Sequence, residues 1–283
     1  MLLKSHFLKR VTIIGVGFMG GSLGLALKKH SLAQEVVGVS SKQSNLMEAI
    51  KVGAIDIAET EVERVIPQSE CIILATPVES IVKILTKIGP LIRKGTIVTD
   101  IGSSKVDIVE VGEKKLQSGG FFIGSHPLVG SEKSGVENAT AELFEKAKCI
   151  ITPTAQTNPA VKEKVKQLWN RIGCDVVSMT PEEHDTIFAY VSHLPHLLSF
   201  GLMETVPKEY LTHAVQSLKD TTRIASSSAQ MWNDILISNS RNVIKALDEC
   251  AKNLSHLRQA IIHKDQKTLI DFFTRVKEKR DSF

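Results

Sequence analysis

The chain contains 283 residues, of which 42% are hydrophobic and 23% are charged, and this length is sufficient for two domains with a sizeable core. Its formal net charge is only +4 and its basic residues are scattered, so we expect no nucleic-acid partner. The four cysteines lie far apart without a CxxC pair, which predicts free thiols in a reducing compartment and no metal site.

The first predicted element is a β-branched strand that leads into a glycine-rich turn within residues 11–27, VTIIGVGFMGGSLGLAL. This uncharged run is shorter than a membrane span and lacks a small-x-small cleavage site, so we expect a cytoplasmic protein without a membrane partner. The pattern Gly15-x-Gly17-x-x-Gly20 between a strand and a helix is typical of dinucleotide binding. Phe18 and Met19 open that helix and belong to the same predicted cofactor site. The alternative is a glycine-rich turn without a ligand.

The second strand, EVVGVS, ends where NAD-binding folds place an acid that binds the ribose 2′-hydroxyl. In this chain the position is taken by Ser40, Ser41 and Lys42. Two small hydroxyls followed by a cation suit a 2′-phosphate, so the sequence favours NADP, with NAD left open. The alternative is that the two serines only begin a helix-capping turn.

Short β-branched runs alternate with helical stretches from residue 10 to residue 178. This rhythm predicts an α/β fold with a doubly wound, mostly parallel sheet covered by helices on both faces. We therefore expect a Rossmann-type NAD(P)-binding domain over residues 1–178. The predicted strands are RVTIIGV, EVVGVS, CIILATP, TIVTDIG, FFIGSHP, KCIITPT and CDVVSM.

The strand signal stops at residue 179, and helical signals continue to the end of the chain. Thr180 followed by Pro181 marks a helix start. Val243, Leu247 and Leu254 recur at helical spacing in a long amphipathic segment. We therefore expect an all-α domain over residues 179–283, with more apolar surface than one small bundle buries, which favours a homodimer.

Polar residues stand at the ends of three predicted strands, where ligands bind in such folds. Thr76 and Pro77 end one strand, where a nicotinamide ribose would pass. Ser103 follows the next strand, and His126 ends the third. Histidine is the usual general base near neutral pH. A single histidine at a strand end is more often structural, but the dinucleotide motif and Ser103 favour catalysis here.

The helical region supplies a second polar group in EEHDTIFAYVSHLPHLL. Asp185, Ser192 and His196 are spaced i, i+7 and i+11, which places them within about 20° on one helix face. Pro195 is expected to kink this helix. Arg223, in the Ser/Thr-rich segment LKDTTRIASSSAQMW, suits bidentate recognition of a carboxylate. The alternatives are a solvated helix face and an exposed loop arginine.

The motifs GVGFMGGSLGLAL, TDIGSSK, GSHPLVGSEKSG, ITPT, HD…VSHLPH and DTTRIA…MW follow one another along the chain. Together they resemble the prephenate/arogenate dehydrogenase family of tyrosine biosynthesis, and most of all its monofunctional prephenate dehydrogenases. The resemblance implies an NAD(P)-binding Rossmann domain and an all-α dimerisation domain. Because the chain ends soon after its last predicted helix, we expect none of the regulatory domain that some relatives carry. It also implies oxidative decarboxylation of prephenate to 4-hydroxyphenylpyruvate, with hydride transfer to NAD(P).

The resemblance also assigns roles to individual residues. His126 matches the histidine that accepts the hydroxyl proton, and Ser103 matches the serine that supports it. Arg223 matches the arginine that binds a substrate carboxylate, His196 a histidine of the substrate pocket, and Glu132 an acid near the pocket mouth. The motif positions with supporting roles are Asp185, Ser192, His193 and Trp232.

Three other functions remain open at this level. An arogenate dehydrogenase accepts an ammonium group in place of the keto group, and His196 favours prephenate because arogenate-preferring relatives can lack it. A β-hydroxyacid dehydrogenase shares the domain layout but uses a lysine of the second domain as acid/base, where this chain has histidines. A non-catalytic dinucleotide sensor has no need of Ser103, His126 and Arg223 together.

Overall fold

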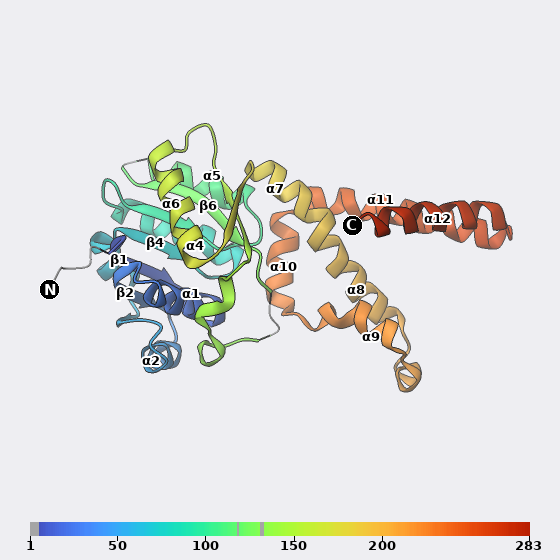
Figure 1. Cartoon of the computed structure of the whole chain (residues 1–283), viewed down its shortest axis with the longest axis horizontal. Helices are drawn as coiled ribbons and strands as arrows, with labels where there is room; N and C mark the ends of the chain where they lie inside the picture. Colours follow the sequence, from blue (N-terminus) through green and yellow to red (C-terminus); the bar gives the residue numbers. More distant parts are fainter. Residues whose placement is uncertain (1–5, 118, 131–132) are drawn as a thin grey trace.

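The computed structural model describes residues 6–117, 119–130 and 133–283. An N-terminal part contains the sheet, and a C-terminal part is helical and extends away from it as a long arm (Figure 1). The predicted fold class, a Rossmann-type sheet followed by an all-α region, is therefore confirmed.

The N-terminal part is built on an eight-stranded sheet with the order β3-β2-β1-β4-β5-β6-β7-β8. All described neighbours pair in parallel except β6 and β7, which pair antiparallel. The chain order reverses at β1 and β4, and dinucleotides bind beyond the carboxyl ends of strands at such a switch point. The strands are β1 (Leu8–Ile14), β2 (Ala33–Val39), β3 (Ile57–Glu59), β4 (Cys71–Leu74), β5 (Ile97–Asp100), β6 (Phe121–Pro127), β7 (Lys148–Thr152) and β8 (Asp175–Ser178).

Helices cover both faces of the sheet, as predicted. Because successive strand residues point to opposite faces, Ile13 of β1 packs in one apolar cluster with α1, α2 and α6, whereas Ile14 packs in another with α3, α4 and α5. The helices are α1 (Phe18–Lys29), α2 (Gln43–Lys51), α3 (Val62–Val65), α4 (Val78–Ile88), α5 (Val106–Lys115) and α6 (Pro159–Ile172), with 3-10 turns η1 (Ile66–Gln68), η2 (Gly89–Leu91), η3 (Val136–Asn138) and η4 (Ala141–Phe144).

Every predicted strand is present, and β3 is an additional one. It has three residues at the edge of the sheet and its side chains are exposed or half-buried. The prediction omitted β3 because an edge strand of this length buries too little surface to require an apolar run.

The predicted helix start at Thr180 and Pro181 is present as the start of α7. The Thr180 hydroxyl accepts a hydrogen bond from the Glu183 backbone N–H, and the Glu183 carboxylate accepts one from the Thr180 N–H, which makes a capping box. The elements are α7 (Pro181–Phe188), a π-helical turn η5 (Ala189–His193), α8 (Leu194–Thr205), η6 (Lys208–His213), α9 (Gln216–Thr222), η7 (Arg223–Ser226), α10 (Ala229–Ser238), α11 (Ser240–Ile262) and α12 (Gln266–Asp281).

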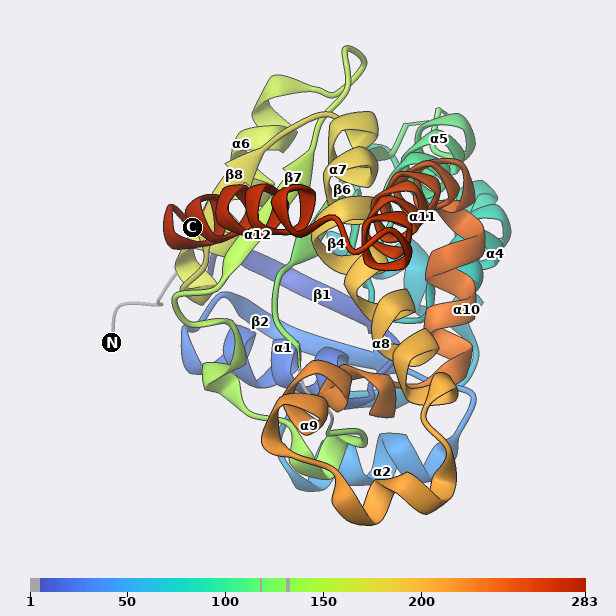
Figure 2. The same ribbon diagram turned by 90° about the vertical axis from the view of Figure 1, so that its right-hand side faces the viewer.

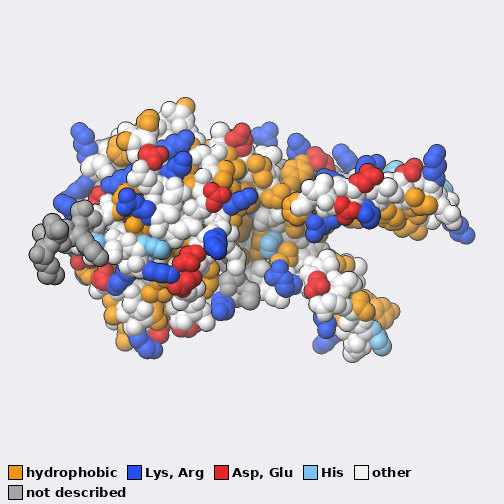
Figure 3. Space-filling model, in the orientation of Figure 1, with side chains coloured by type: hydrophobic (Ala, Val, Ile, Leu, Met, Phe, Trp, Pro, Cys, Tyr) orange, Lys and Arg blue, Asp and Glu red, His pale blue; other side chains and the backbone are white. Residues whose placement is uncertain are grey.

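Helix α10 attaches the helical part to the sheet part. Its Trp232 and Ile235 are buried in the same apolar cluster as α4, and Figure 2 shows the two helices side by side. In contrast, α11 and α12 leave apolar side chains exposed along the arm (Figure 3). Within the described ranges, no helix combines the length and the apolar character that crossing a membrane requires.

Candidate active site

Each glycine of the first turn meets a different steric environment, which explains why it lacks a side chain. Gly15 has a φ of +100°, and a Cβ there would lie 2.4 Å from the carbonyl oxygen of Ala75. A Cβ on Gly20 would lie 1.8 Å from the carbonyl oxygen of Gly15. A Cβ on Gly17 would meet nothing within 4 Å, so the space over the turn is open toward a ligand. The turn therefore fits a bound pyrophosphate.

The N-terminus of α1 is a ready anion site beside these glycines. Its N-cap residue Gly17 provides no side-chain cap, and the first turn, which begins with Phe18 and Met19, contains no acid. Its free backbone N–H groups thus fit the phosphates of a dinucleotide. On the other side of the crevice, the Thr76 hydroxyl is buried and has no hydrogen-bond partner among the described residues, and Pro77 caps α4.

The end of β2 carries no acid that faces a ribose. Ser41 and Lys42 are exposed, and the Lys42 backbone N–H donates to the Ser40 hydroxyl at 3.2 Å. Glu59, at the end of the neighbouring β3, is occupied by its own loop, because its carboxylate accepts the N–H groups of Thr60 and Glu61 at 2.8 and 3.0 Å. The exposed Lys42 and the hydroxyls of Ser40 and Ser41 thus follow β2, beside the internally bound Glu59.

A buried ion pair supports the strand ends between β5 and β6. The Lys105 ammonium binds the Asp100 carboxylate and donates to the Ser125 carbonyl at 2.9 Å, and none of the three residues is accessible. Asp100 also accepts the N–H groups of Ser125 at 3.1 Å and Gly102 at 2.7 Å. A buried pair of this kind is tolerated only when further hydrogen bonds satisfy both charges, as they do here. It fixes the segment that carries His126.

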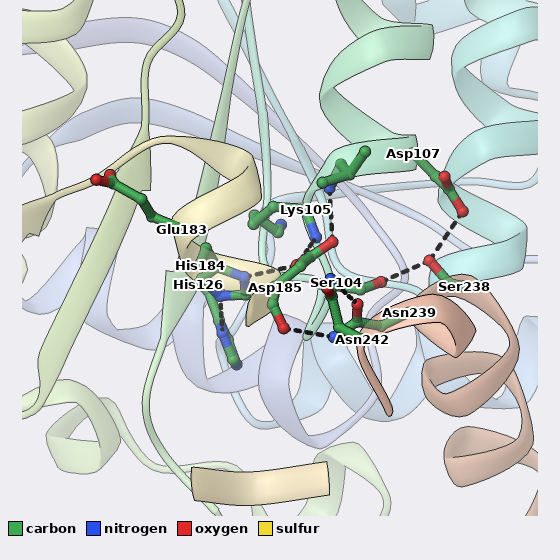
Figure 4. Close-up of polar contacts among 12 residues, drawn as sticks. Ser104, Lys105, Asp107, His126, Glu183, His184, Asp185, Ser238, Asn239 and Asn242 are labelled. Atoms are coloured by element: carbon green, nitrogen blue, oxygen red, sulfur yellow. Dashed lines mark hydrogen bonds and ion pairs between the residues drawn. The ribbon is translucent and has the colours of Figure 1, made fainter. Parts of the chain in front are cut away.

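His126 is partly exposed at the end of β6, and its ring is held from one side. Its Nδ1 lies 2.8 Å from Nε2 of His184, and no described residue forms a hydrogen bond with its Nε2. The contact between the two rings is the dashed line that joins them in Figure 4. Phe188 contacts both rings, stacking on His184 at 4.4 Å between centroids. Burial, reinforced by His184, Lys105 and His193, lowers the pKa of His126 well below its ordinary value. The ring is therefore neutral at pH 7, as a base must be.

The hydrogen-bond chain continues from His184 to Asp185. Nδ1 of the fully buried His184 lies 2.8 Å from Oδ1 of Asp185. The Asp185 carboxylate also accepts the backbone N–H groups of Lys105 at 2.7 Å and Val106 at 2.9 Å, at the start of α5. Burial lowers the pKa of His184, although the hydrogen bond to Asp185 opposes this shift.

The surroundings of Asp185 therefore differ from those expected for a residue that binds substrate. Its side chain is only 1% exposed and both of its carboxylate oxygens are bound by protein groups. It caps α5 and orients His184 instead. His184 itself was not among the predicted site residues.

The helix after Asp185 does not keep the α-helical register that the spacing argument assumed. Pro195 is accommodated by the π-helical turn Ala189–His193, which inserts one extra residue rather than a plain kink. His193 consequently lies on the buried face, whereas Ser192 is half-buried. Nδ1 of His193 accepts from the Asn239 amide at 3.2 Å, and burial lowers the pKa of His193 to about 4.

His196 lies on the same side of the molecule as Arg223. The His196 ring stacks on Trp232 with centroids 3.7 Å apart, and its Nδ1–H donates to the Ser192 carbonyl at 2.9 Å. Burial lowers the pKa of His196, and the nearby guanidinium of Arg223 adds to this effect. Arg223 is exposed at the start of η7 and pairs with no carboxylate in the described part of the chain.

Two predicted residues remain to be placed. Ser103 is half-buried after β5, and among the described residues its hydroxyl makes no hydrogen bond, including to His126. The neighbouring Ser104 is buried and bonds Ser238 at 2.9 Å. Glu132 lies outside the described residues, so its predicted position at the pocket mouth stays a prediction.

Family models match almost the whole chain. Residues 23–178 match the nucleotide-binding domain of prephenate dehydrogenase, and residues 180–275 match its dimerization domain. The chain belongs to the prephenate dehydrogenase family. A member from Bacillus subtilis (strain 168), named prephenate dehydrogenase, is 33% identical over 278 residues, which cover 96% of this chain and 75% of that protein.

Solved structures of this family have the same architecture. The prephenate dehydrogenase of Aquifex aeolicus in complex with hydroxyphenyl propionate and NAD+ superposes with a TM-score of 0.90, at 34% identity over 98% of this chain and 99% of that one. The arogenate dehydrogenase of Synechocystis gives a TM-score of 0.82 at 26% identity, over 96% and 99% of the two chains.

The buried histidines predict how stability depends on pH. His126, His184 and His193 have lowered pKa values in the folded protein, so below the ordinary value of about 6.5 the unfolded chain binds more protons than the folded one. The free energy of unfolding, measured with urea from pH 7 to pH 4, should therefore fall with pH, and His193 alone should contribute roughly 3 kcal/mol of this loss. For His193 the loss is complete near pH 4.

Two variants test the contribution of His193. His193→Gln removes the buried histidine, and His256→Gln is the matched control because His256 is exposed on α11. The first should reduce the slope of stability against pH, and the second should leave it unchanged. Equal slopes in both variants would contradict the assignment to His193.

Proposed function

We propose that the chain converts prephenate to 4-hydroxyphenylpyruvate and CO2, with a nicotinamide dinucleotide as the hydride acceptor. The observation that carries this proposal is the position of His126 at a strand end of a dinucleotide-binding sheet, with Nδ1 bound to His184 and Nε2 without a described partner. Family membership supports the type of reaction. The Aquifex relative, solved with hydroxyphenyl propionate and NAD+, supports an aromatic carboxylate as ligand.

The reaction requires one base and a well-placed substrate. His126 accepts the proton of the ring hydroxyl at Nε2, while the hydrogen on the same carbon leaves as hydride. The bound cofactor supplies the nicotinamide ring that takes this hydride. When the ring carboxylate departs as CO2, its electron pair moves through the ring to the oxygen, which regains the proton as a phenol. Aromatisation supplies much of the driving force, so the protein mainly positions groups and moves one proton.

Arg223 and His196 are our candidates for substrate binding. Prephenate has two carboxylates, and a guanidinium that pairs with no carboxylate of the described residues suits one of them. The Arg223 guanidinium lowers the pKa of His196, and we assign both side chains to the binding of one substrate. We assign supporting roles in this pocket to Ser103 and Ser192, and Glu132 rests on the family resemblance alone.

We propose NADP as the preferred cofactor, with NAD as the alternative. The exposed Lys42 and the hydroxyls of Ser40 and Ser41 at the end of β2 suit a 2′-phosphate, and Glu59 is bound to its own loop. The NAD+ in the Aquifex relative favours the alternative. Prephenate is preferred over arogenate because His196 is present, although the Synechocystis relative is an arogenate dehydrogenase.

We infer a cytoplasmic homodimer with a domain boundary at residues 178 and 179. The four cysteines are free thiols, which fits a reducing compartment. The match to a dimerization domain covers α11 and the first part of α12, up to residue 275, where Leu254 and Phe273 are 56% and 57% exposed. A second copy would remove this apolar surface from water.

Light scattering should therefore report twice the mass of one chain. Leu254→Glu places a charge in the apolar surface and should shift the mass toward that of one chain, whereas Lys252→Glu on the exposed α11 surface serves as a control for added negative charge. A wild-type protein with the mass of one chain would contradict the dimer.

Turnover of four substrate and cofactor pairs tests the reaction. Purified protein should reduce NADP or NAD with prephenate faster than with arogenate, followed by the absorbance of the reduced cofactor. His126→Asn should lower kcat by about 10²–10⁴-fold because the base is lost, with little change in cofactor affinity. No reduction with any pair would refute the proposed function, and a large loss of cofactor affinity would make His126 structural.

Arg223→Ala tests the carboxylate contact. Loss of a charged hydrogen bond that is present in both the ground state and the transition state should raise KM for prephenate by roughly 10–100-fold with little change in kcat. The KM of Arg223→Lys should lie between that of the wild type and that of Arg223→Ala, since an ammonium keeps the charge without the planar fork of donors. An unchanged KM in Arg223→Ala would rule out the anchor role.

A further inference from the structure

We propose that His184 is a positioning residue that, together with the Asp185 carboxylate, fixes the tautomer of His126 so that Nε2 is the free base. This inference rests on the proposed function, because it explains how the assigned base is kept ready. The three side chains form a continuous hydrogen-bond chain from Asp185 through His184 to His126 (Figure 4).

The tautomers follow from the Asp185 end of the chain. An ionised carboxylate only accepts hydrogen bonds, so the 2.8 Å contact requires the proton on Nδ1 of His184. A neutral His184 then has an unprotonated Nε2, which accepts at 2.8 Å from Nδ1–H of His126. The only proton of neutral His126 is thereby on Nδ1, and Nε2 carries the lone pair that takes the substrate proton.

The Asp185 carboxylate lies at the start of α5. It accepts two backbone N–H groups at the start of α5, from Lys105 and Val106, where the helix dipole also favours a negative charge. When His126 becomes an imidazolium, this carboxylate stabilises the new positive charge through His184. The base His126 is thus oriented by the acid Asp185, as in a catalytic triad, but with the imidazole of His184 between them.

Packing around the hydrogen-bonded side chains leaves little freedom for the His126 and His184 rings to turn. His184 is fully buried and stacks on Phe188 with an interplanar angle of 21°, and Phe188 also contacts His126. The Asn239 amide donates to the backbone carbonyl of Asp185 at 2.7 Å, which holds the residue from the α11 side. The hydrogen bonds of the chain are therefore maintained without rotation of either imidazole.

The direct test is the ¹⁵N NMR spectrum of histidine side chains in the full-length protein, with and without NADP. We expect His126 and His184 each to carry the proton on Nδ1, with His126→Asn and His184→Gln providing the assignments. A proton on Nε2 of neutral His126 in the wild type would overturn the proposal. This measurement needs no substrate, so it stands even if the protein turns over neither prephenate nor arogenate.

Three variants separate positioning from packing. His184→Leu removes the acceptor and should lower kcat by about 100-fold and leave the His126 tautomer mixed, with KM and cofactor affinity nearly unchanged. His184→Gln offers an oxygen to Nδ1–H of His126 and should recover a large part of that loss. Asp185→Asn keeps an oxygen for His184 but removes the charge, so kcat should fall roughly 10–100-fold while the tautomers persist.

His213→Gln, at an exposed histidine of η6, should match the wild type in every readout. Equal kcat values for folded His184→Leu and His184→Gln would show that His184 only fills space, and would overturn the positioning role. Loss of prephenate turnover in the wild type, with the expected tautomers present, would refute the proposed function but not the hydrogen-bond chain.

Discussion

The Asp185 carboxylate at the start of α5 joins the two parts of the molecule. It lies on α7 of the helical part, yet it satisfies the backbone N–H groups of Lys105 and Val106 in the sheet part. Through His184 it also reaches His126 at the end of β6. One side chain thus caps a helix, fixes how α7 docks and completes the surroundings of the proposed base. Removal of this carboxylate would leave buried N–H groups unsatisfied as well as a histidine without orientation.

The Lys105–Asp100 pair gives the same region its second support. The β5–β6 ladder runs from Ile97 to Thr99 on β5, and β6 then turns to pair with β7. Where the ladder ends, Asp100 accepts the Ser125 N–H and Lys105 donates to the Ser125 carbonyl, so side chains replace the missing sheet contacts. The base therefore stands on a strand end that pairs with β7 on one side and is held by internal charges on the side of β5.

Much of the fold could be predicted because its signals are local. The dinucleotide turn, the β-branched runs and the helix start at Thr180 are each contained in a short segment, and each was found in the structure. The site was harder to predict because its contacts join residues that are far apart in the sequence: His126 and His184 are separated by 58 positions. The spacing of His184 and Phe188 at i and i+4 could have indicated a buried face, but not which residue lies opposite it. The π-helical turn at Pro195 also shifted His193 into the place that α-helical spacing gave to Ser192.

His126 lies in the sheet part and His184 in the helical part, and this separation has a consequence for how the protein forms during translation. During translation the whole sheet, up to Ser178, emerges before α7 does, so the Rossmann part is able to form first. At that stage His126 is present but its orienting partner is not. The nascent chain can thus acquire a nucleotide crevice before it acquires an ordered base. The proposed base therefore gains its orienting partner only when α7 docks on the sheet part.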